Sequence, residues 1–217
     1  MSSFPGLSHL RLVLVAVCLM PLLSGCVWLA ATGMVAGVSA ARQERTMGNA
    51  IDDLRIKSAI ESRLVQESPS LFLNVSVTVI EGRVLLTGRV ANPQTRIDAT
   101  RVSWSVEGVR KVDNDIEVTD ETGWLDRPKD IYIRTHLAAT LLADKTIRDV
   151  NYTIDTVNGV VYLTGIAQDQ GELDRVIAHA QGMDDVKRVE NYVLLKDDPA
   201  RYGFGSPTPP SAPPPAP

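Results

Sequence analysis

The sequence predicts an α+β protein with two similar domains, each a three-stranded mixed sheet with two helices in the order α-β-β-α-β. The main observation is an internal repeat, because residues 53–118 match residues 130–195 without a gap at a constant offset of 77. The clearest overlap pairs IEGRVLLTG, from residue 80, with VNGVVYLTG, from residue 157. Self-similarity at a fixed offset marks a duplicated structural unit, and a unit of about 66 residues can enclose its own small core.

The first helix of each repeat is predicted from apolar residues that recur at helical spacing. Over residues 52–66 these residues share one helical face, Asp52 and Asp53 are placed to cap the N-terminus, and Pro69 is expected to stop the helix. The predicted inward residues are Ile56, Ile60 and Leu64 in the first repeat and Ile133, Leu137 and Leu141 in the second.

A β-hairpin is predicted after the first helix. The segment VSVTV, from residue 75, alternates apolar and polar residues, and RVLLTGRV, from residue 83, supplies the returning strand. Glu81-Gly82 and Asn158-Gly159 lie at the two turns, with glycine where a positive φ is expected.

A second helix and a third strand complete each repeat. The helix opens at Asn92-Pro93 in the first repeat, and residues 109–118 have the pattern of a strand. The predicted inward residues of the second helices are Ala99, Val102, Ser103 and Val106 in the first repeat and Val176, Ala180 and Met183 in the second.

The first 25 residues have the organisation of a secretory signal peptide. A polar start with Arg11 precedes an apolar run over residues 12–23 and then small residues. The sequence Leu-Ser-Gly-Cys that ends at Cys26 resembles a bacterial lipobox, which would make Cys26 the acylated first residue of the mature lipoprotein. A plain signal peptide that contains a cysteine, or an uncleaved anchor over residues 12–41, are the alternatives. Cys18 would leave with the signal, so no disulfide is expected.

The remaining boundaries follow from composition. Residues 26–50 form a tether whose apolar part, 27–41, is too short to cross a bilayer as one helix. A segment that hugs the membrane and an unstructured spacer are both open interpretations. The first domain is predicted over 51–119, a linker over 120–129, the second domain over 130–197, and a Pro-rich disordered tail over 198–217.

Composition also limits the function. The net charge of −4 argues against general nucleic-acid binding, which needs a basic surface. After removal of the signal only His136 and His179 remain, and no His/Cys/Asp/Glu cluster has metal-ligand spacing. No glycine-rich phosphate-binding motif is present. We therefore expect no enzyme, no catalytic residue, no metal and no cofactor.

The repeat resembles the BON domain of bacterial envelope proteins. The family pattern combines a turn glycine, a V-x-L-[ST]-G strand and a later Val-x-x-Val-x-Asn strand. Asp185 departs from it, since the family usually has glycine there, as at Gly108, and we expect a change in the last turn of the second helix. The matching residues are Gly82, Val84, Leu86, Thr87, Gly88, Val109, Val112 and Asn114 in the first copy, and Gly159, Val161, Leu163, Thr164, Gly165, Val186, Val189 and Asn191 in the second.

The resemblance implies an envelope lipoprotein that binds anionic phospholipid and supports outer-membrane integrity. Its expected location is the outer membrane, anchored by lipidated Cys26 and facing the periplasm. Val27 agrees with this, because an Asp at that position would favour retention in the inner membrane. The alternative function is an adaptor for an outer-membrane assembly or secretion complex, with an outer-membrane protein as partner.

The resemblance places phospholipid contact on the first helix of the second domain. With the core positions assigned, Ile131, Tyr132 and His136 point elsewhere, and Tyr132 is the main candidate. In the alternative reading Tyr132 packs between the domains, while Asp126 and Asp130 offset the basic residues. The complete set of candidate contacts is Tyr132, His136, Arg127, Lys129 and Arg134.

A second candidate surface follows from helix geometry. Ile97 and Trp104, seven residues apart, share the face opposite the predicted core, with Arg101 between them. Apolar residues on an outer face indicate an interface. The sister domain, a protein partner and the bilayer are its possible occupants.

Overall fold

The computed structural model describes residues 46–119 and 127–201. The predicted signal peptide, Cys26, the tether up to residue 45, Asp126 and the tail after residue 201 lie outside these residues. The described residues belong to one compact unit. Within the described ranges, no helix has the length and apolarity needed to cross a membrane.

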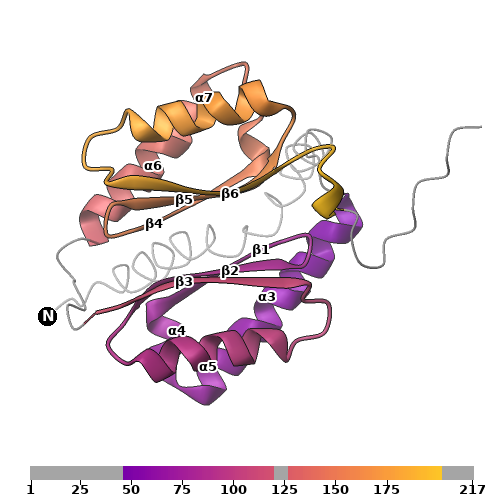
Figure 1. Ribbon diagram of the computed structural model, residues 1–217, viewed down its shortest axis with the longest axis vertical. Helices are drawn as coiled ribbons and strands as arrows, with labels where there is room; N and C mark the ends of the chain where they lie inside the picture. Colours follow the sequence, from indigo (N-terminus) through magenta and orange to yellow (C-terminus); the bar gives the residue numbers. More distant parts are fainter. Residues whose placement is uncertain (1–45, 120–126, 202–217) are drawn as a thin grey trace, which may run out of the picture. The chain divides into compact units, whose positions relative to one another are not determined.

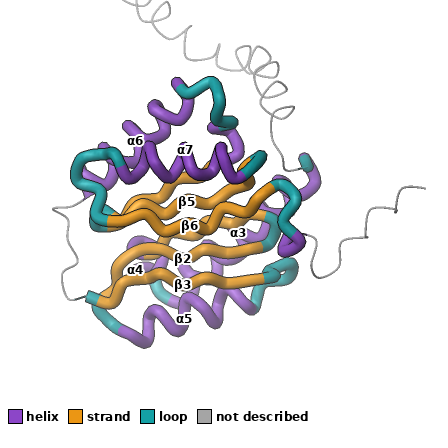
Figure 2. Tube along the Cα trace, turned by 45° about the horizontal axis from the view of Figure 1, so that its top comes forward, coloured by secondary structure: helices purple, strands orange, loops and turns teal. Residues whose placement is uncertain are grey.

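The predicted order α-β-β-α-β is confirmed in both domains, and in each the helices cover one face of the sheet (Figures 1 and 2). The first domain contains α3 (Met47–Glu67), α4 (Pro69–Asn74), β1 (Val75–Ile80), β2 (Arg83–Val90), α5 (Pro93–Trp104) and β3 (Lys111–Val118). The second contains α6 (Arg127–Ala143), η3 (Asp149–Asn151), β4 (Tyr152–Val157), β5 (Val160–Ala167), α7 (Gln170–Gln181), β6 (Arg188–Leu195) and η4 (Pro199–Arg201).

Each sheet is mixed, as predicted. In the first domain β2 lies in the centre, antiparallel to β1 and parallel to β3. In the second domain β5 takes the central place between β4 and β6 with the same directions. The strands of the second domain begin and end 77 residues after their counterparts, which confirms the constant offset of the repeat.

The inward faces of the helices agree with the predicted periodicity. Met183 is partly buried against the second core, and every other predicted inward residue is buried. The start of α3 differs from the prediction, because Thr46 is the N-cap and accepts a hydrogen bond from the Asn49 amide at 3.2 Å. Helix α3 ends before Pro69 as predicted. Pro69 is also the first residue of a short helix, α4, which the sequence pattern did not predict.

Asp53 and Asp130 hold the hairpin turns instead of capping helices. The Asp53 carboxylate accepts hydrogen bonds from the amides of Glu81 at 2.8 Å and Gly82 at 2.9 Å. Asp130 accepts equivalent bonds, both of 2.8 Å, from Asn158 and Gly159. All four turn residues have φ between 51° and 74°, which is typical of a type I′ turn. Each first helix is therefore tied to the hairpin of its own domain.

We expect Asp53→Asn to lower the free energy of unfolding by about 2 kcal/mol, because the side chain would keep one acceptor for two buried amides. Asp53 is buried, so water cannot replace the lost bond. Chemical denaturation followed by circular dichroism measures the change. The exposed neighbour Asp52 provides the control variant Asp52→Asn. An equal effect of the two substitutions would contradict this role for Asp53.

The departure at Asp185 leaves the second helix unchanged in extent. Helices α5 and α7 have the same bounds at an offset of 77. The expected change in the last turn of α7 is therefore wrong as far as the end of the helix is concerned. Asp185 adopts φ 66° where Gly108 adopts φ 94°. Aspartate tolerates the left-handed region better than most residues, which explains how the turn survives without glycine.

The faces of the two sheets that the helices leave open pack against each other. Leu85 of β2 joins Val160 and Tyr162 of β5 in a separate apolar cluster. Thr87 donates a hydrogen bond to Asp155, and the Tyr192 hydroxyl donates one to Asp115 at 2.5 Å. Strand β5 is thus buried on both faces.

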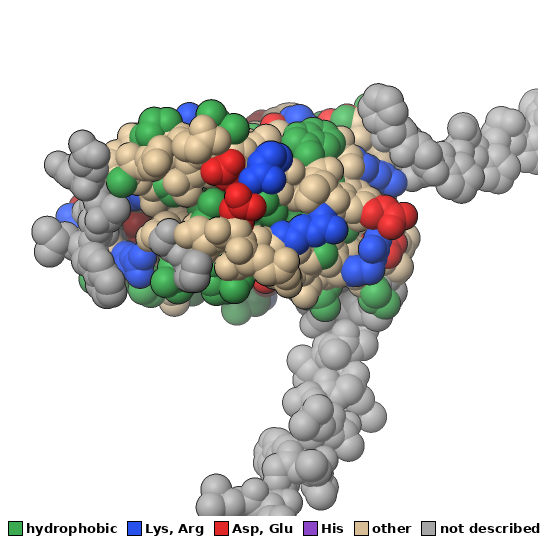
Figure 3. All heavy atoms as spheres, turned by 90° about the horizontal axis from the view of Figure 1, so that it is seen from below, with side chains coloured by type: hydrophobic (Ala, Val, Ile, Leu, Met, Phe, Trp, Pro, Cys, Tyr) green, Lys and Arg blue, Asp and Glu red, His purple; other side chains and the backbone are tan. Residues whose placement is uncertain are grey.

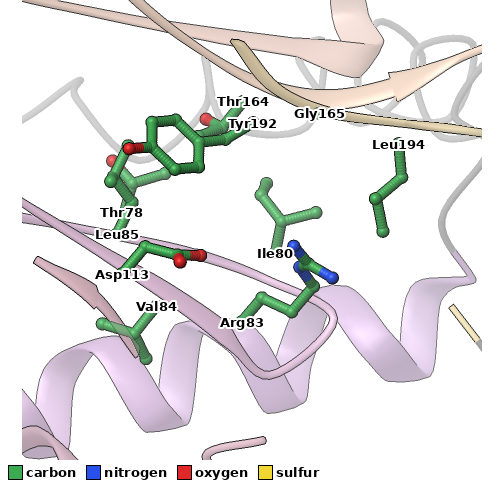
Figure 4. A pocket seen from close by; sticks show the side chains of 10 residues that line it. All are labelled: Thr78, Ile80, Arg83, Val84, Leu85, Asp113, Thr164, Gly165, Tyr192 and Leu194. Carbon is green, nitrogen blue, oxygen red and sulfur yellow. The ribbon is translucent and has the colours of Figure 1, made fainter. Parts of the chain in front are cut away.

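The contact between the two sheets contains two tyrosines whose pKa values are raised. Burial raises the pKa of Tyr192, and the hydrogen bond to Asp115 raises it further. Burial also raises the pKa of Tyr162 to about 12. Figure 4 shows the one-water-sized space left beside Tyr192, a cavity of about 20 Å³ into which Ile80, Arg83 and Leu194 also point. Its size excludes a ligand larger than a water molecule.

The last described residues fasten the second domain to the first. Arg201, in η4, forms a two-pronged ion pair with Glu81, with Nη2–Oε1 at 2.7 Å and Nε–Oε2 at 3.1 Å. The side chains of Arg201 and Glu81 are only 8% and 6% exposed. Glu81 belongs to the turn that Asp53 holds, so this contact, which we call the C-terminal clasp, joins the end of the second domain to the hairpin of the first.

Candidate functional site

The outer surface of α6 carries the aromatic candidate residues. Tyr132 is 58% exposed, so the alternative in which it packs between the domains is wrong. Its ring lies against the ring of His136, with centroids 5.4 Å apart and an angle of 35° between the planes. Tyr132 and His136 therefore form one exposed aromatic pair, as their shared exposure in the sequence prediction implies.

The basic candidates lie on different sides of this pair. Lys129, near the start of α6, forms an ion pair with Asp185, with Nζ and Oδ1 3.5 Å apart. Arg127 and Arg134 are seven residues apart, which places them on one side of the helix, and both line a groove at the first domain. The five predicted contacts are thus brought onto one helix but do not converge on one point.

An apolar stripe on α6 escaped the sequence prediction, apart from its first residue. Ile131, Thr135, Ala138 and Leu142 are all exposed and follow each other at spacings of four, three and four residues. This spacing puts them on one face of the helix. Leu142 could have been recognised in the sequence from its distance of three turns to Ile131. The stripe gives α6 a second, solvent-facing apolar surface in addition to its core face.

The charge beside this stripe differs between the two domains. In α3, Lys57 forms an ion pair with Glu61 at 3.8 Å. The positions 77 residues later are Arg134 and Ala138, so the basic residue is retained and its acidic partner is replaced by a methyl group. Arg134 has no hydrogen bond or ion pair with any residue in the described ranges. Its guanidinium is available to an anion from outside.

The groove that Arg127 and Arg134 line has a volume of about 800 Å³. We call it the α4–α6 groove, because its opposite wall begins with Phe72 and Leu73 of α4. The edge strands β1 and β4 form its floor. The first domain thus contributes apolar side chains to a hollow whose basic side chains come from the second.

The candidate surface on α5 is exposed as predicted. Ile97 and Trp104 are 59% and 51% exposed, so the sister domain does not cover them. Arg101 between them is bound to Glu67 at 2.8 Å and to Asp98 at 3.4 Å. Figure 3, seen from the side on which α5 lies in Figure 1, shows basic and acidic side chains mixed among apolar ones. Arg101 therefore has acidic partners within the first domain.

The described residues contain no group of three or more His, Cys, Asp or Glu side chains that could hold a metal ion. The pKa of Asp144 is lowered, first by the hydrogen bond from the Thr146 hydroxyl and then by His179. This carboxylate therefore serves the local structure of the turn after α6.

Comparison with known proteins identifies the family. The model of the BON domain matches residues 52–120 and 129–197. Similar proteins include an uncharacterized protein in the gshII 5' region of Anaplasma centrale, 44% identical over 67% of this chain and 96% of that protein. Osmotically-inducible protein Y of Escherichia coli (strain K12) is 30% identical over 69% of this chain and 76% of its own. Outer membrane lipoprotein DolP of Haemophilus influenzae is 28% identical over 79% and 90%.

The comparisons indicate no enzyme family. The two matched segments coincide with the two α-β-β-α-β units of the structure and together make up more than half of the chain. The chain belongs to the BON domain family and carries two copies of that domain in tandem.

Proposed function

We propose that this protein is an outer-membrane lipoprotein that binds anionic phospholipid through α6 of its second BON domain and supports envelope integrity. The similarity to an outer membrane lipoprotein supports the location and the anchoring through Cys26. Helix α6 supports the binding, since it presents Ile131 and Leu142 for the apolar boundary of a membrane and Tyr132 for the headgroup level.

The observation that carries the proposal is the difference between the two domains at one pair of positions. Lys57 is neutralised by Glu61 in the first domain, whereas Arg134 has Ala138 in place of the acidic partner. A guanidinium that has no partner among residues 46–119 and 127–201, next to an exposed apolar stripe, suits a surface that is both anionic and apolar. A basic residue near an anionic membrane contributes about 1 kcal/mol, so the second domain is the binding domain.

The test is sedimentation of residues 43–217 with vesicles, either neutral or containing phosphatidylglycerol. This fragment is a compact unit and lacks Cys26, so a lipid anchor cannot produce the binding. We expect binding to the anionic vesicles only. Arg134→Ala should weaken it about fivefold, and Ala138→Glu should weaken it more, because it restores the ion pair of the first domain and adds a negative charge. Tyr132→Ala should also weaken it, through loss of the interfacial aromatic ring.

Lys111→Ala is the control, since it removes a basic residue of the first domain that pairs with Asp113 and lies outside the α4–α6 groove, and it should leave binding unchanged. Failure of the wild-type fragment to bind anionic vesicles would contradict the proposal. In that event the exposed pair Ile97 and Trp104 on α5 favours the second candidate function, an adaptor for an outer-membrane protein complex.

A further inference from the structure

Phe72 and Leu73 in the first domain have exposed side chains that the BON scaffold does not require. Leu71, which precedes them in α4, is buried in the core of the first domain and fixes the helix in place. Phe72 and Leu73 are 40% and 71% exposed. The repeat-equivalent of Phe72 is Asp149, so the second domain has no aromatic residue there. We call Phe72 and Leu73 the apolar prong.

The prong faces a basic wall across the α4–α6 groove. Phe72 and Leu73 line one side of the groove, and Arg127 and Arg134 line the other. A phospholipid offers a partner for both kinds of side chain. Its phosphate is anionic and can pair with a guanidinium, and its glycerol end continues into hydrocarbon, which suits an exposed apolar pair. A soluble anion would need the arginines but not the prong.

Each acidic side chain that also lines the groove, namely Glu61, Asp130 and Asp155, has a partner within the protein. Asp130 accepts two turn amides, and Asp155 accepts the Thr87 hydroxyl. Glu61 pairs with Lys57. These contacts hold the carboxylates in place, and none of them involves Arg134.

From this arrangement we propose that the phospholipid site is shared between the domains. One anionic phospholipid places its headgroup in the α4–α6 groove against Arg134, while the apolar prong of the first domain enters the apolar layer of the membrane. The inference rests on the proposed function and deepens it, because the isolated second domain would then hold only half of the site. The contact between the sheets and the C-terminal clasp would set the width of the groove.

The first test compares vesicle sedimentation of the double variant Phe72→Ser/Leu73→Ser with wild type, both as residues 43–217. We expect about tenfold weaker binding to phosphatidylglycerol vesicles, because the variant lacks two large apolar side chains whose transfer from water into the membrane would favour binding. Leu54→Ser is the matched control, because Leu54 on α3 is 67% exposed and does not line the groove. Unfolding curves establish that the variants are folded.

The second test reads the location of the prong directly. Residues 43–217 contain no cysteine, so a single environment-sensitive fluorophore can be attached through Leu73→Cys or, as control, through Leu54→Cys. We expect anionic vesicles to shift the emission to shorter wavelength at position 73 and not at position 54. Normal sedimentation without a shift at position 73 would overturn the shared site and leave the proposed function intact, with a protein segment as the next occupant to test. Absence of sedimentation in wild type would overturn both.

Discussion

Replacing Gly88 with alanine is expected to unfold the first domain or to lower its free energy of unfolding by more than about 4 kcal/mol. Gly88 has φ 134°, which an L-residue rarely adopts. A Cβ atom at this position would lie 2.0 Å from the backbone oxygen of Asn74. That oxygen cannot retreat easily, because the next residue, Val75, begins β1 and pairs with Gly88 itself. Thermal and denaturant unfolding of residues 43–217, followed by circular dichroism, measure the loss.

The second repeat offers a replicate of this experiment and α3 offers its control. Gly165 has φ 144°, and an added Cβ would lie 2.1 Å from the Asn151 oxygen, so Gly165→Ala should have a similar effect. Gly48, in the first turns of α3, has its nearest neighbouring atom at 3.9 Å. Gly48→Ala should be neutral or slightly stabilising, since alanine is the better helix former. If Gly88→Ala lowers the free energy of unfolding by less than about 1 kcal/mol, the start of β1 moves away from the added Cβ atom more easily than its pairing with β2 suggests.

Local periodicity was sufficient to predict the elements that pack within each domain. Helical spacing relates Ile56, Ile60 and Leu64, which are all buried. Residues at this spacing share one face of a helix, and this does not depend on the rest of the chain. The repeat strengthened this prediction, because each assignment in one copy could be checked in the other. The inward helix residues and the returning strand β2 therefore follow from the sequence, whereas β3 begins at residue 111 and not at the predicted 109.

Contacts between distant segments were not available in the same way. Asp53 near a helix start suggests a cap, and nothing in the local pattern reveals that its acceptors serve a turn 28 residues later. Arg201 lies after the repeat, where composition indicates only a tail. The segment VVYLTGIA in β5 lacks alternation, a pattern that is typical of a strand buried on both faces and that indicates a contact beyond its own domain.

The candidate lipid site was predicted in part. The choice of helix comes from the resemblance to the BON domain, whereas the exposure of Tyr132 and His136 follows once the core face is assigned. The role proposed for Arg134 rests on the comparison with the Lys57–Glu61 pair, which needs both the sequence and the distance between the side chains. The apolar prong follows Pro69, which reads as a helix stop, and its position opposite Arg134 depends on how the two domains pack.

Removal of Arg201 is the second large effect that we expect. Arg201→Ala leaves Glu81 buried with an unpaired charge, and removal of one partner from a buried ion pair typically lowers stability by about 3–5 kcal/mol. The double variant Glu81→Ala/Arg201→Ala should lose less than the sum of the single variants, because no charge remains unpaired. Denaturant unfolding of the four proteins gives this cycle. Arg188→Ala is the matched control.

The control separates burial from the mere presence of an ion pair. Arg188 and Glu190 approach to 2.6 Å, slightly closer than Arg201 and Glu81, but their side chains are 63% and 36% exposed. A solvated pair contributes about 0–1 kcal/mol, so Arg188→Ala should change stability little. Equal effects of Arg188→Ala and Arg201→Ala would show that the C-terminal clasp does not depend on its burial. A large effect of Arg201→Ala alone would establish that the last turn after the second domain holds the first domain in place, and with it the wall of the α4–α6 groove.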